Sequence, residues 1–339
     1  MKLGIIPDFH LREKLSYDEF IKGGRQQEEQ DILDFVVDSF KNVDKIIFMG
    51  DIFNSRSPSS TVIRKFINFI ERLDKKELYV IAGNHDQLYS CTKSSLDFIK
   101  EIKSKDWHII TNEIVKEGDF TFMPYFTRQF LDVGTHEEAT DILMKKLKPN
   151  KILFTHHSIS GTSTSSGIET NVFDEIVLPK KELEKKFKLI VGGHIHQPSI
   201  KNNTIVAGSL MTSTVGELQK YIWKIDAATL KYEQIKLPGR AIYKLTDPTD
   251  KDLKIDKSSI VKVILTKKLS AVKIGELKEK LKKFDAYILL EKIPRHREKL
   301  HYGGDEGLLE FPLEKLLELY AKERKIDINK LKMGFELIR

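Results

Sequence analysis

The chain is poor in the residues that build cross-linked or membrane-bound proteins. It has a single cysteine, Cys91, which excludes a disulfide framework and any Cys-x-x-Cys metal site and fits a reducing compartment. No apolar run approaches the roughly 18 residues that a membrane span needs, and the N-terminal apolar stretch is too short for a signal peptide. There is also no GxxxxGKS or GxxxxGKT loop to hold the phosphates of ATP. These absences predict a cytoplasmic protein without a membrane anchor and without an ATP site of its own.

Positive charge is concentrated toward the end of the chain. The formal net charge is +7, and residues 241–339 contribute +6 of it through 23 Lys and Arg against 17 Asp and Glu. Such asymmetry suggests a polyanionic partner such as nucleic acid. From charge alone, a lysine-rich surface that is simply solvated explains it equally well.

Short apolar segments alternate with amphipathic ones over the first 235 residues. Residues 25–40 and 60–74 each place apolar side chains on one helical stripe. Strands are expected around these helices at residues 2–6, 45–49, 78–82, 151–155 and 189–191. Three further strands, without helices between them, are expected at residues 204–206, 220–225 and 232–237. The alternation predicts an α/β architecture of packed layers.

A change of pattern at Leu237-Pro238-Gly239-Arg240 predicts a domain boundary. We therefore expect one domain over residues 1–237 and a second over residues 241–339. The second domain begins with a β-α-β pattern at residues 260–265, 274–284 and 286–291. In the first domain, the Ser-, Thr- and Gly-rich segment 158–167 predicts a loop.

The tail of the second domain predicts one more helix, at residues 312–324. Pro312 suits its first turn. Its apolar stripe consists of Leu313, Leu316, Leu317 and Tyr320. This stripe either packs on its own domain or docks a partner, and the helical period alone does not distinguish the two.

Side chains that bind metals follow each of the five strands expected first. They are Asp8 and His10, Asp51, the run Asn84-His85-Asp86, the pair His156-His157, and His194 with His196. In an open α/β sheet, ligands bind at the carboxyl ends of the strands, so we expect these side chains at one edge. Asp8 and His10 alternate along the chain, as do His194 and His196. An extended backbone would therefore point both members of each pair the same way.

The donors in these motifs are a mixture of hard oxygen and imidazole nitrogen. Such a mixture suits Mn, Fe, Zn or Co better than Ca or Cu(I). The donors suffice for two ions that share a carboxylate, and two such ions can clamp the attacking and leaving oxygens of a phosphoryl displacement. Each motif alone has a structural explanation as a turn or a buried histidine. Five of them in order, each after an apolar strand, favour a metal site.

In this order the motifs resemble the calcineurin-like metallophosphoesterase superfamily over residues 1–235. Within it, the segments GDIFNSR, ILFTHHSI, GGHIHQP and IVAGSL are most similar to SbcD-type nuclease subunits of DNA repair and recombination complexes, in their short phage-like form. The resemblance implies a layered sheet sandwich flanked by helices. It also implies a small α+β capping domain that binds DNA, with a helical tail.

The resemblance assigns a role to each motif residue. Asp8, His10 and His196 would hold metal one, Asn84, His156 and His194 would hold metal two, and Asp51 would bridge both. His85 would contact the scissile phosphate or protonate the leaving oxygen. Asn54 and Asp86 would support these groups from behind; Asn54 stands where SbcD-type sequences often carry His or Asp. His157 competes with His156 for one ligand position, and the resemblance favours the first of the two.

The implied function is that of a DNA exonuclease and endonuclease subunit that hydrolyses phosphodiester bonds with a hydroxide activated by two divalent ions, which we expect to be Mn²⁺. Its implied partners are DNA, a separate SMC-like ATPase of the SbcC type and a second copy of the chain, in the host cytoplasm if a phage encodes it. One alternative is a metallophosphoesterase that acts on a phosphoprotein, a nucleotide or a small diester. Another is a non-catalytic binding scaffold, which is disfavoured because no expected ligand is missing.

Overall fold

The computed structural model describes residues 1–18, 24–73, 76–88, 92–101, 106–162, 175–214, 216–217, 219–257, 259–266, 270–284 and 287–292. The chain divides into two units, Met1–Ile293 and Pro294–Arg339, and every described residue lies in the first. The helix expected at residues 312–324 and Cys91 lie outside the described residues, as do residues 163–167 of the loop expected at 158–167. In the described half of that segment, Ser158–Ile159 form a short strand rather than a loop, because they pair with Val177–Leu178. Within the described part of the chain, no helix combines the length and apolar character that crossing a membrane requires.

The first of two large sheets is built around the N-terminal strand. Its order is β14-β13-β1-β2-β3-β4. The bounds are β1 (Lys2–Ile6), β2 (Lys45–Phe48), β3 (Glu77–Ile81), β4 (Trp107–Ile110), β13 (Tyr221–Asp226) and β14 (Tyr232–Lys236). Strands β1 to β4 are parallel, whereas β13 pairs antiparallel with β1 and β14 pairs antiparallel with β13.

The second sheet is built from the middle of the chain. Its order is β11-β12-β10-β7-β6-β5. The bounds are β5 (Val115–Glu117), β6 (Phe120–Met123), β7 (Asn150–Thr155), β10 (Phe187–Gly192), β11 (Ser199–Lys201) and β12 (Thr204–Val206). Its four central strands, β12, β10, β7 and β6, are parallel, and the edge strands are antiparallel. Between β7 and β10 in the sequence, two short strands, β8 (Ser158–Ile159) and β9 (Val177–Leu178), pair with each other in parallel.

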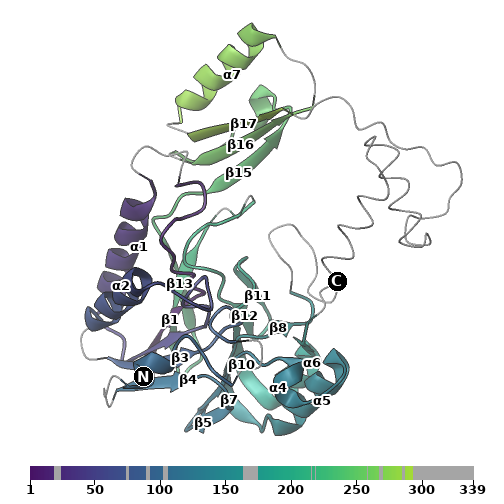
Figure 1. Cartoon of the computed structure of the whole chain (residues 1–339). Helices are drawn as coiled ribbons and strands as arrows, with labels where there is room; N and C mark the ends of the chain where they lie inside the picture. Colours follow the sequence, from purple (N-terminus) through teal and green to yellow (C-terminus); the bar gives the residue numbers. More distant parts are fainter. Residues whose placement is uncertain are drawn as a thin grey trace, which may run out of the picture. The chain divides into compact units, whose positions relative to one another are not determined.

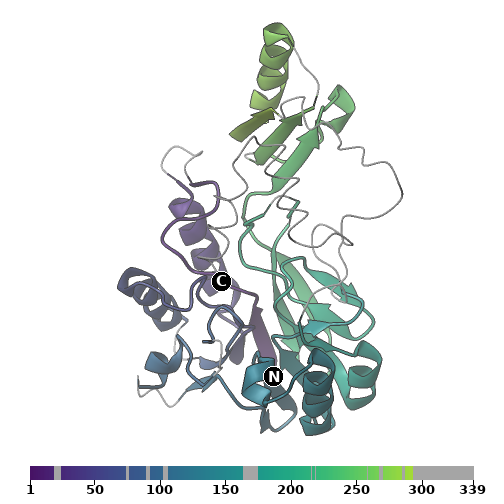
Figure 2. The ribbon, with the colours of Figure 1, turned by 45° about the vertical axis from the view of Figure 1, so that its right-hand side comes forward.

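The two sheets share one apolar core, and each has helices on its outer face (Figures 1 and 2). Between the sheets, Tyr79 stacks on Phe122 with 4.6 Å between ring centroids. The helices α1 (Gln26–Ser39) and α2 (Ser60–Glu71) pack on the first sheet. The helices α5 (His136–Lys146) and α6 (Lys180–Lys186) pack on the second. The result is a helix–sheet–sheet–helix sandwich, which confirms the expected fold class.

Burial on both faces explains the composition of these strands. In β1, Leu3 and Ile5 enter the core between the sheets, whereas Ile6 faces the helices. A parallel strand covered on both sides reads as a continuous apolar run, which is why β1, β2, β3, β7 and β10 were recognisable in the sequence. The expected helices agree within one to three residues with α1 and α2. The sequence did not predict α5 or α6, nor the short helices α3 (Asp97–Glu101) and α4 (Arg128–Leu131).

A third, three-stranded parallel sheet follows the Pro-Gly segment. It consists of β15 (Ile242–Thr246), β16 (Ile260–Leu265) and β17 (Tyr287–Lys292), with a 3-10 turn at Asp250–Asp252 and helix α7 (Ala271–Lys282). Val261, Val263 and Leu281 centre an apolar cluster of its own. Helix α7 begins three residues earlier than expected because the Ser270 side chain accepts a hydrogen bond from the Lys273 amide. The division into domains 1–237 and 241–339 stays a prediction, since residues 293–339 are not described.

Backbone and ion-pair contacts tie β15 to the first part of the chain. The Arg240 amide donates to Glu28 over 2.8 Å, and Glu28 also pairs with the fully buried guanidinium of Arg25. Ile242, the first residue of β15, exchanges two backbone hydrogen bonds of 3.0 Å with Gly216 and Glu217. The strand is therefore anchored in the loop that follows β12, and that loop also borders the site described next.

Candidate metal centre

The expected ligands meet where the carboxyl ends of both large sheets converge. Strands β1, β2 and β3 of the first sheet lead to Asp8, Asp51 and Asn84, and strands β7 and β10 of the second lead to His156 and His194. The expectation that these side chains lie at one edge of a single sheet is therefore wrong, because the donors come from two sheets. Backbone hydrogen bonds join the segments, since His10 donates to the Asp51 carbonyl over 2.7 Å and Gly193 donates to the Thr155 carbonyl over 2.9 Å.

One group of donors consists of Asp8, His10 and His196, with ligand atoms all within 4.8 Å of one another. The Nε2 atoms of His10 and His196 are 2.8 Å apart. Asp8 is fully buried, and among the described residues neither of its carboxylate oxygens has a hydrogen-bond partner. Burial raises the pKa of Asp8 well above its usual value. An unpartnered buried carboxylate is costly, and a cation bound here would remove that cost, so the group fits a metal ion.

A second group gathers around the side-chain oxygen of Asn84. His156 Nε2 lies 3.2 Å from Asn84 Oδ1, and His194 Nδ1 lies 2.9 Å from the same atom. His156 Nδ1 is 2.6 Å from the Met49 carbonyl, so Nδ1 carries an N–H and Nε2 is the ring nitrogen that faces the group. Burial alone would lower the pKa of His156, but the charges of Asp51 and Asp8 outweigh it and raise the pKa to about 10.

Asp51 lies between the two groups. Its Oδ2 is 3.4 Å from His10 Nε2, and its Oδ1 is 3.4 Å from His156 Nε2. Although Asp51 is buried, the neighbouring histidines hold the pKa of its carboxyl far below the ordinary value. This is the placement expected of a bridging carboxylate. The ligand roles of all seven residues stay predictions, but the structure brings the seven together.

The backbone around the site differs from the extended form that the alternation suggested. His10, Asp51 and His194 have φ values of 50°, 46° and 71°, in the left-handed region. His194 and His196 consequently reach different groups rather than facing the same way, and that expectation is wrong. Non-glycine residues in this region store strain that the surrounding structure must hold, as is common at functional sites.

His85 lies beside the cluster and is held through its backbone and its ring. Its amide donates to Asp51 Oδ1 over 2.8 Å, and its Nδ1 is 2.9 Å from the backbone carbonyl of Asn54. The ring centroid of His85 is 4.9 Å from that of His10. Asn54 thus contacts His85 through its main chain, while its side chain accepts a 3.4 Å hydrogen bond from Arg12. Nδ1 of His85 is thus occupied by the Asn54 carbonyl, whereas Nε2 is the ring nitrogen left for another contact.

Asp86 joins the two loops that carry Asp51 and Asn84. Its carboxylate accepts hydrogen bonds of 3.0 Å from the amides of Ile52, Phe53 and Gly83. Burial and the charge of Asp51 raise the pKa of Asp86 to about 7, against these bonds. Gly83 is required here, because a Cβ at this position would collide with the Asp51 carboxylate. Asp86 therefore supports the site without facing it.

His157 faces away from the cluster. Its Nε2 accepts a hydrogen bond of 3.1 Å from the Phe126 amide, and its ring stacks on Tyr125 with 5.0 Å between centroids. Burial, with the nearby charges of His194 and His156, lowers the pKa of His157 to about 3. A neutral acceptor in an aromatic stack has a structural role. The structure therefore places His156 rather than His157 among the donors.

Sequence reasoning missed three charged residues that touch the site histidines. Glu175 Oε2 lies 2.7 Å from His194 Nε2, and Glu217 Oε1 lies 3.4 Å from His196 Nδ1. Lys220 pairs with Glu217 over 3.0 Å and donates to the His196 carbonyl over 2.8 Å. None of the three stands in a metal-binding motif, so their spacing carried no signal.

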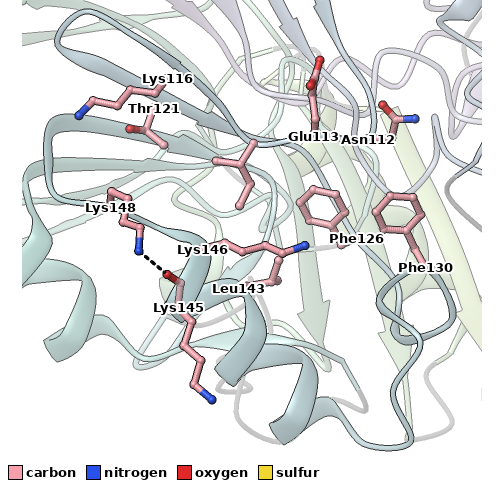
Figure 3. A pocket seen from close by; sticks show the side chains of 11 residues that line it. Asn112, Glu113, Lys116, Thr121, Phe126, Phe130, Leu143, Lys145, Lys146 and Lys148 are labelled. Atoms are coloured by element: carbon pink, nitrogen blue, oxygen red, sulfur yellow. Dashed lines mark hydrogen bonds between the residues drawn. The ribbon is translucent and has the colours of Figure 1, made fainter.

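A separate hollow of about 660 Å³ lies on the second sheet and α5, away from the donors (Figure 3). Phe126, Phe130 and Leu143 give it an apolar lining. The lysines around it are Lys116, Lys145, Lys146 and Lys148, and Lys146 extends toward Phe126 (Figure 3). None of the cluster residues lines this hollow, so it is not part of the metal centre.

Comparison with known proteins identifies a family for more than half of the chain. The family model for calcineurin-like phosphoesterases matches residues 1–198. A solved structure of an archaeal phosphodiesterase is 15% identical, with a TM-score of 0.35, over 70% of this chain and 100% of the other. A hypothetical protein from Pyrococcus horikoshii OT3 is 12% identical, with a TM-score of 0.35, over 84% of this chain and 94% of the other. TM-scores of this size carry no inference about the chain. No curated protein matches it significantly.

Proposed function

The chain belongs to the calcineurin-like phosphoesterase family, and we propose that it is a Mn²⁺-dependent nuclease that hydrolyses the phosphodiester bonds of DNA. The observation that carries the proposal is the position of Asp51, whose two oxygens each lie 3.4 Å from a histidine of a different donor group. A shared carboxylate lets two cations lie within the roughly 3.5–4 Å that a two-metal phosphoryl displacement requires.

The family uses a dinuclear metal centre, and the donors of this chain fit one. Asp8, His10 and His196 would hold one ion, and Asn84, His156 and His194 would hold the other. When bound, the ions supply an activated water and neutralise the charge of the phosphate. Mn²⁺ is the proposed ion because it accepts carboxylate, amide and imidazole donors together.

His85 is the residue proposed to move a proton. The carbonyl of Asn54, 2.9 Å from Nδ1, fixes the ring and leaves Nε2 to face the substrate. An alkoxide leaving group needs a proton, and histidine supplies one near neutral pH. The hydrogen bond that the His85 amide donates to Asp51 Oδ1 holds this residue beside the bridging carboxylate.

Positive charge supports DNA as the substrate rather than a phosphoprotein or a small diester. Residues 241–339 carry +6 of the net +7. The four lysines of the hollow form no ion pair within the described residues. Lys and Arg contacts to phosphates give affinity without sequence preference, as a repair nuclease needs.

The substrate proposal is tested by offering the purified chain a panel of substrates with Mn²⁺. The panel contains linear duplex DNA, single-stranded DNA, a phosphodiester dye, a phosphomonoester, a nucleotide and a phosphoprotein. We expect hydrolysis of DNA and of the diester dye, its loss with a chelator and its loss in Asp51→Ala. Hydrolysis of the nucleotide, phosphoprotein or monoester without cleavage of DNA would overturn the nuclease assignment. Inactivity of the metal-loaded chain on every substrate would favour a binding scaffold.

We also propose that the chain works in the cytoplasm with a separate SMC-like ATPase and as a homodimer that forms through helices of the first domain. The support is the missing ATP loop and the resemblance to subunits that act with such an ATPase. The apolar stripe at Leu313, Leu316, Leu317 and Tyr320 is the proposed ATPase contact.

The double substitution Leu316→Asp with Leu317→Asp tests this contact and should impair co-purification with the ATPase while the fold stays intact. Unchanged co-purification, or global unfolding, would argue against it; sedimentation of the chain alone tests the dimer.

A further inference from the structure

Each histidine of the Gly193-His194-Ile195-His196 segment has a carboxylate on the ring nitrogen that faces away from the donor groups. In His194, Nδ1 faces Asn84 and Nε2 faces Glu175. In His196 the assignment is reversed, because Nε2 faces His10 and Nδ1 faces Glu217. The two rings therefore present opposite nitrogens to the cluster.

The contact of Glu175 with His194 is close and mostly shielded from water. Glu175 Oε2 lies 2.7 Å from His194 Nε2, and the two side chains are 14% and 17% exposed. The other carboxylate oxygen accepts a 2.5 Å hydrogen bond from the Ser158 hydroxyl. Ser158 belongs to the short strand β8, so the carboxylate is held from both ends.

The contact of Glu217 with His196 is longer and more deeply buried. Glu217 Oε1 lies 3.4 Å from His196 Nδ1, and the Glu217 side chain is 1% exposed. Lys220 pairs with the same carboxylate over 3.0 Å, and the Ser213 amide donates to it over 2.8 Å. These bonds fix Glu217 against its histidine even though neither lies in a regular element.

We propose that Glu175 and Glu217 are positioning residues that set opposite tautomers in the two histidines. Glu175, a charged and closer acceptor than the Asn84 amide oxygen, holds the proton of His194 on Nε2 and leaves the Nδ1 lone pair for the group around Asn84. Glu217 holds the proton of His196 on Nδ1 and leaves the Nε2 lone pair for the group around Asp8. Each carboxylate thereby supports one cation only, an assignment that rests on the two-metal function proposed above.

A carboxylate on the distal nitrogen fixes the orientation of a ligand histidine and makes it a better donor. Loss of such a partner typically lowers metal affinity 10–100-fold. Because the two partners serve different groups, their loss should weaken different ions. A carboxylate that merely stabilised the fold would lower both affinities alike, or neither.

The first test reads the tautomers in the metal-free full-length chain. Two-bond ¹⁵N–¹H correlation spectra of the imidazoles, recorded at a pH where the rings are neutral, should show the Nε2–H form for His194 and the Nδ1–H form for His196. Glu175→Ala should release the preference in His194 alone, and Glu217→Ala that in His196 alone. The same tautomer in both histidines, or unchanged tautomers in the variants, would overturn the proposal.

The second test uses Zn²⁺ as a diamagnetic probe and follows the ring shifts of both histidines during a titration. Glu175→Ala should lower the affinity for the ion that shifts the His194 resonances by 10–100-fold. Glu217→Ala should lower the affinity for the ion that shifts the His196 resonances to the same extent. Glu175→Gln and Glu217→Gln should each retain part of the affinity. Glu77→Gln is the matched control, because Glu77 contacts His108 over 3.3 Å on β3 and β4, outside the cluster. Wild-type affinities in Glu175→Ala, or equal weakening of both ions in each variant, would overturn the proposal.

The two proposals fail in different ways. If the wild-type chain bound fewer than two ions, the two-metal function would fall, while the tautomer measurement would still decide the positioning roles. If Glu217→Ala did not fold because Lys220 lost its partner, Glu217→Gln and the less buried Glu175 variants would carry the decision. Glu175 is suited to this, since its side chain is 14% exposed, against 1% for Glu217.

Discussion

The backbone carbonyl of Asn54 lies 2.9 Å from Nδ1 of His85. This contact fixes a ring that lies beside the donor groups, with 4.9 Å between its centroid and that of His10. The atom of residue 54 that contacts His85 belongs to the main chain, so this contact does not depend on the side chain at that position. The side chain of Asn54 is left to contact Arg12.

Replacing His85 should separate metal binding from chemistry. We expect His85→Ala to keep both ions and to lower DNA cleavage by roughly 10²–10⁴-fold, the usual loss when a general acid is removed. Metal content by atomic emission and single-turnover cleavage measure the two effects. Asn54→Ala is the matched control and should leave cleavage within a few-fold of wild type, because the carbonyl remains. Loss of an ion in His85→Ala would instead make His85 a ligand, which its 4.8 Å grouping with His10 and Asp51 permits.

Removing the shared carboxylate should affect both ions at once. Asp51→Ala should abolish hydrolysis and lower metal content below two ions per chain, while circular dichroism shows a folded protein. Asp119→Ala, in an exposed ion pair with Lys151, serves as the control and should change neither quantity. Full activity with two bound ions in Asp51→Ala would refute the bridging assignment.

Asp8 should lower the stability of the metal-free fold while it contributes to metal binding. Among the described residues, neither of its buried oxygens has a hydrogen-bond partner, so the metal-free fold bears the cost of burying this group. We expect Asp8→Asn to raise the free energy of unfolding in chelator, on the order of 1–3 kcal/mol. In Mn²⁺ the wild type should become more stable than the variant, because it gains metal-binding free energy that the variant lacks. Urea unfolding under the two conditions measures this, and a variant less stable in both would contradict it.

His157 should make the metal-free fold sensitive to acid. Its pKa is about 3 in the folded chain against 6.5 in the unfolded chain, so between these values only the unfolded state binds the proton. The free energy of unfolding therefore falls as pH drops from 6.5 toward 3, by about 2 kcal/mol by pH 5 from this group alone. His157→Gln keeps an acceptor for the Phe126 amide and should remove that part of the pH dependence. Urea unfolding of both proteins at pH 7 and pH 5 in chelator tests it, and parallel losses would refute it.

The stability of a truncated chain should depend on where the chain is cut, whereas the loss of DNA affinity should not. Chains ending at Gly239 or at Tyr243 should both cleave a diester dye and both lose most duplex DNA affinity, since the basic segment is gone from each. The longer one keeps the Arg240 bond to Glu28 and the pairing of Ile242 with Gly216 and Glu217, and should be more stable by roughly 1–3 kcal/mol. Thermal unfolding and salt-dependent DNA binding are the measurements. Undiminished DNA binding by either truncated chain would defeat the assignment of affinity to the second domain.

The strands and the metal donors could be predicted from the sequence because both leave local signals. A strand buried on two faces is an apolar run, as at β1 and β10, and the motifs stand directly after it. The division of these strands between two sheets could not be predicted, since an apolar pattern reports that a face is buried and not against which neighbour. Strand β4 was missed because its Trp107 and His108 are only half-buried and interrupt an apolar pattern.

The finer geometry of the site depends on contacts between distant segments. Glu175 lies 19 residues before His194, and Glu217 reaches His196 only because the chain turns back after β12. The left-handed backbone of His10 and His194 has little signal in residue type, because histidine, although enriched in this region, adopts other conformations at most positions. Such strain exists where the surrounding fold enforces it, so it follows from the tertiary structure.

The antiparallel pairing of β1 with β13 sets an order of events during synthesis. Lys2 lies opposite Asp226, so one side of the first strand lacks its neighbour until residue 226 has left the ribosome. At usual elongation rates the delay is roughly 10–45 s. During it, Ile5 and its neighbours in β1 expose an unpaired apolar edge of the kind that chaperones bind. The last strand needed to complete the first sheet is thus among the last parts of the first 237 residues to be made, and Asp8, His10 and Asp51 leave the ribosome well before His194 and His196 can join them.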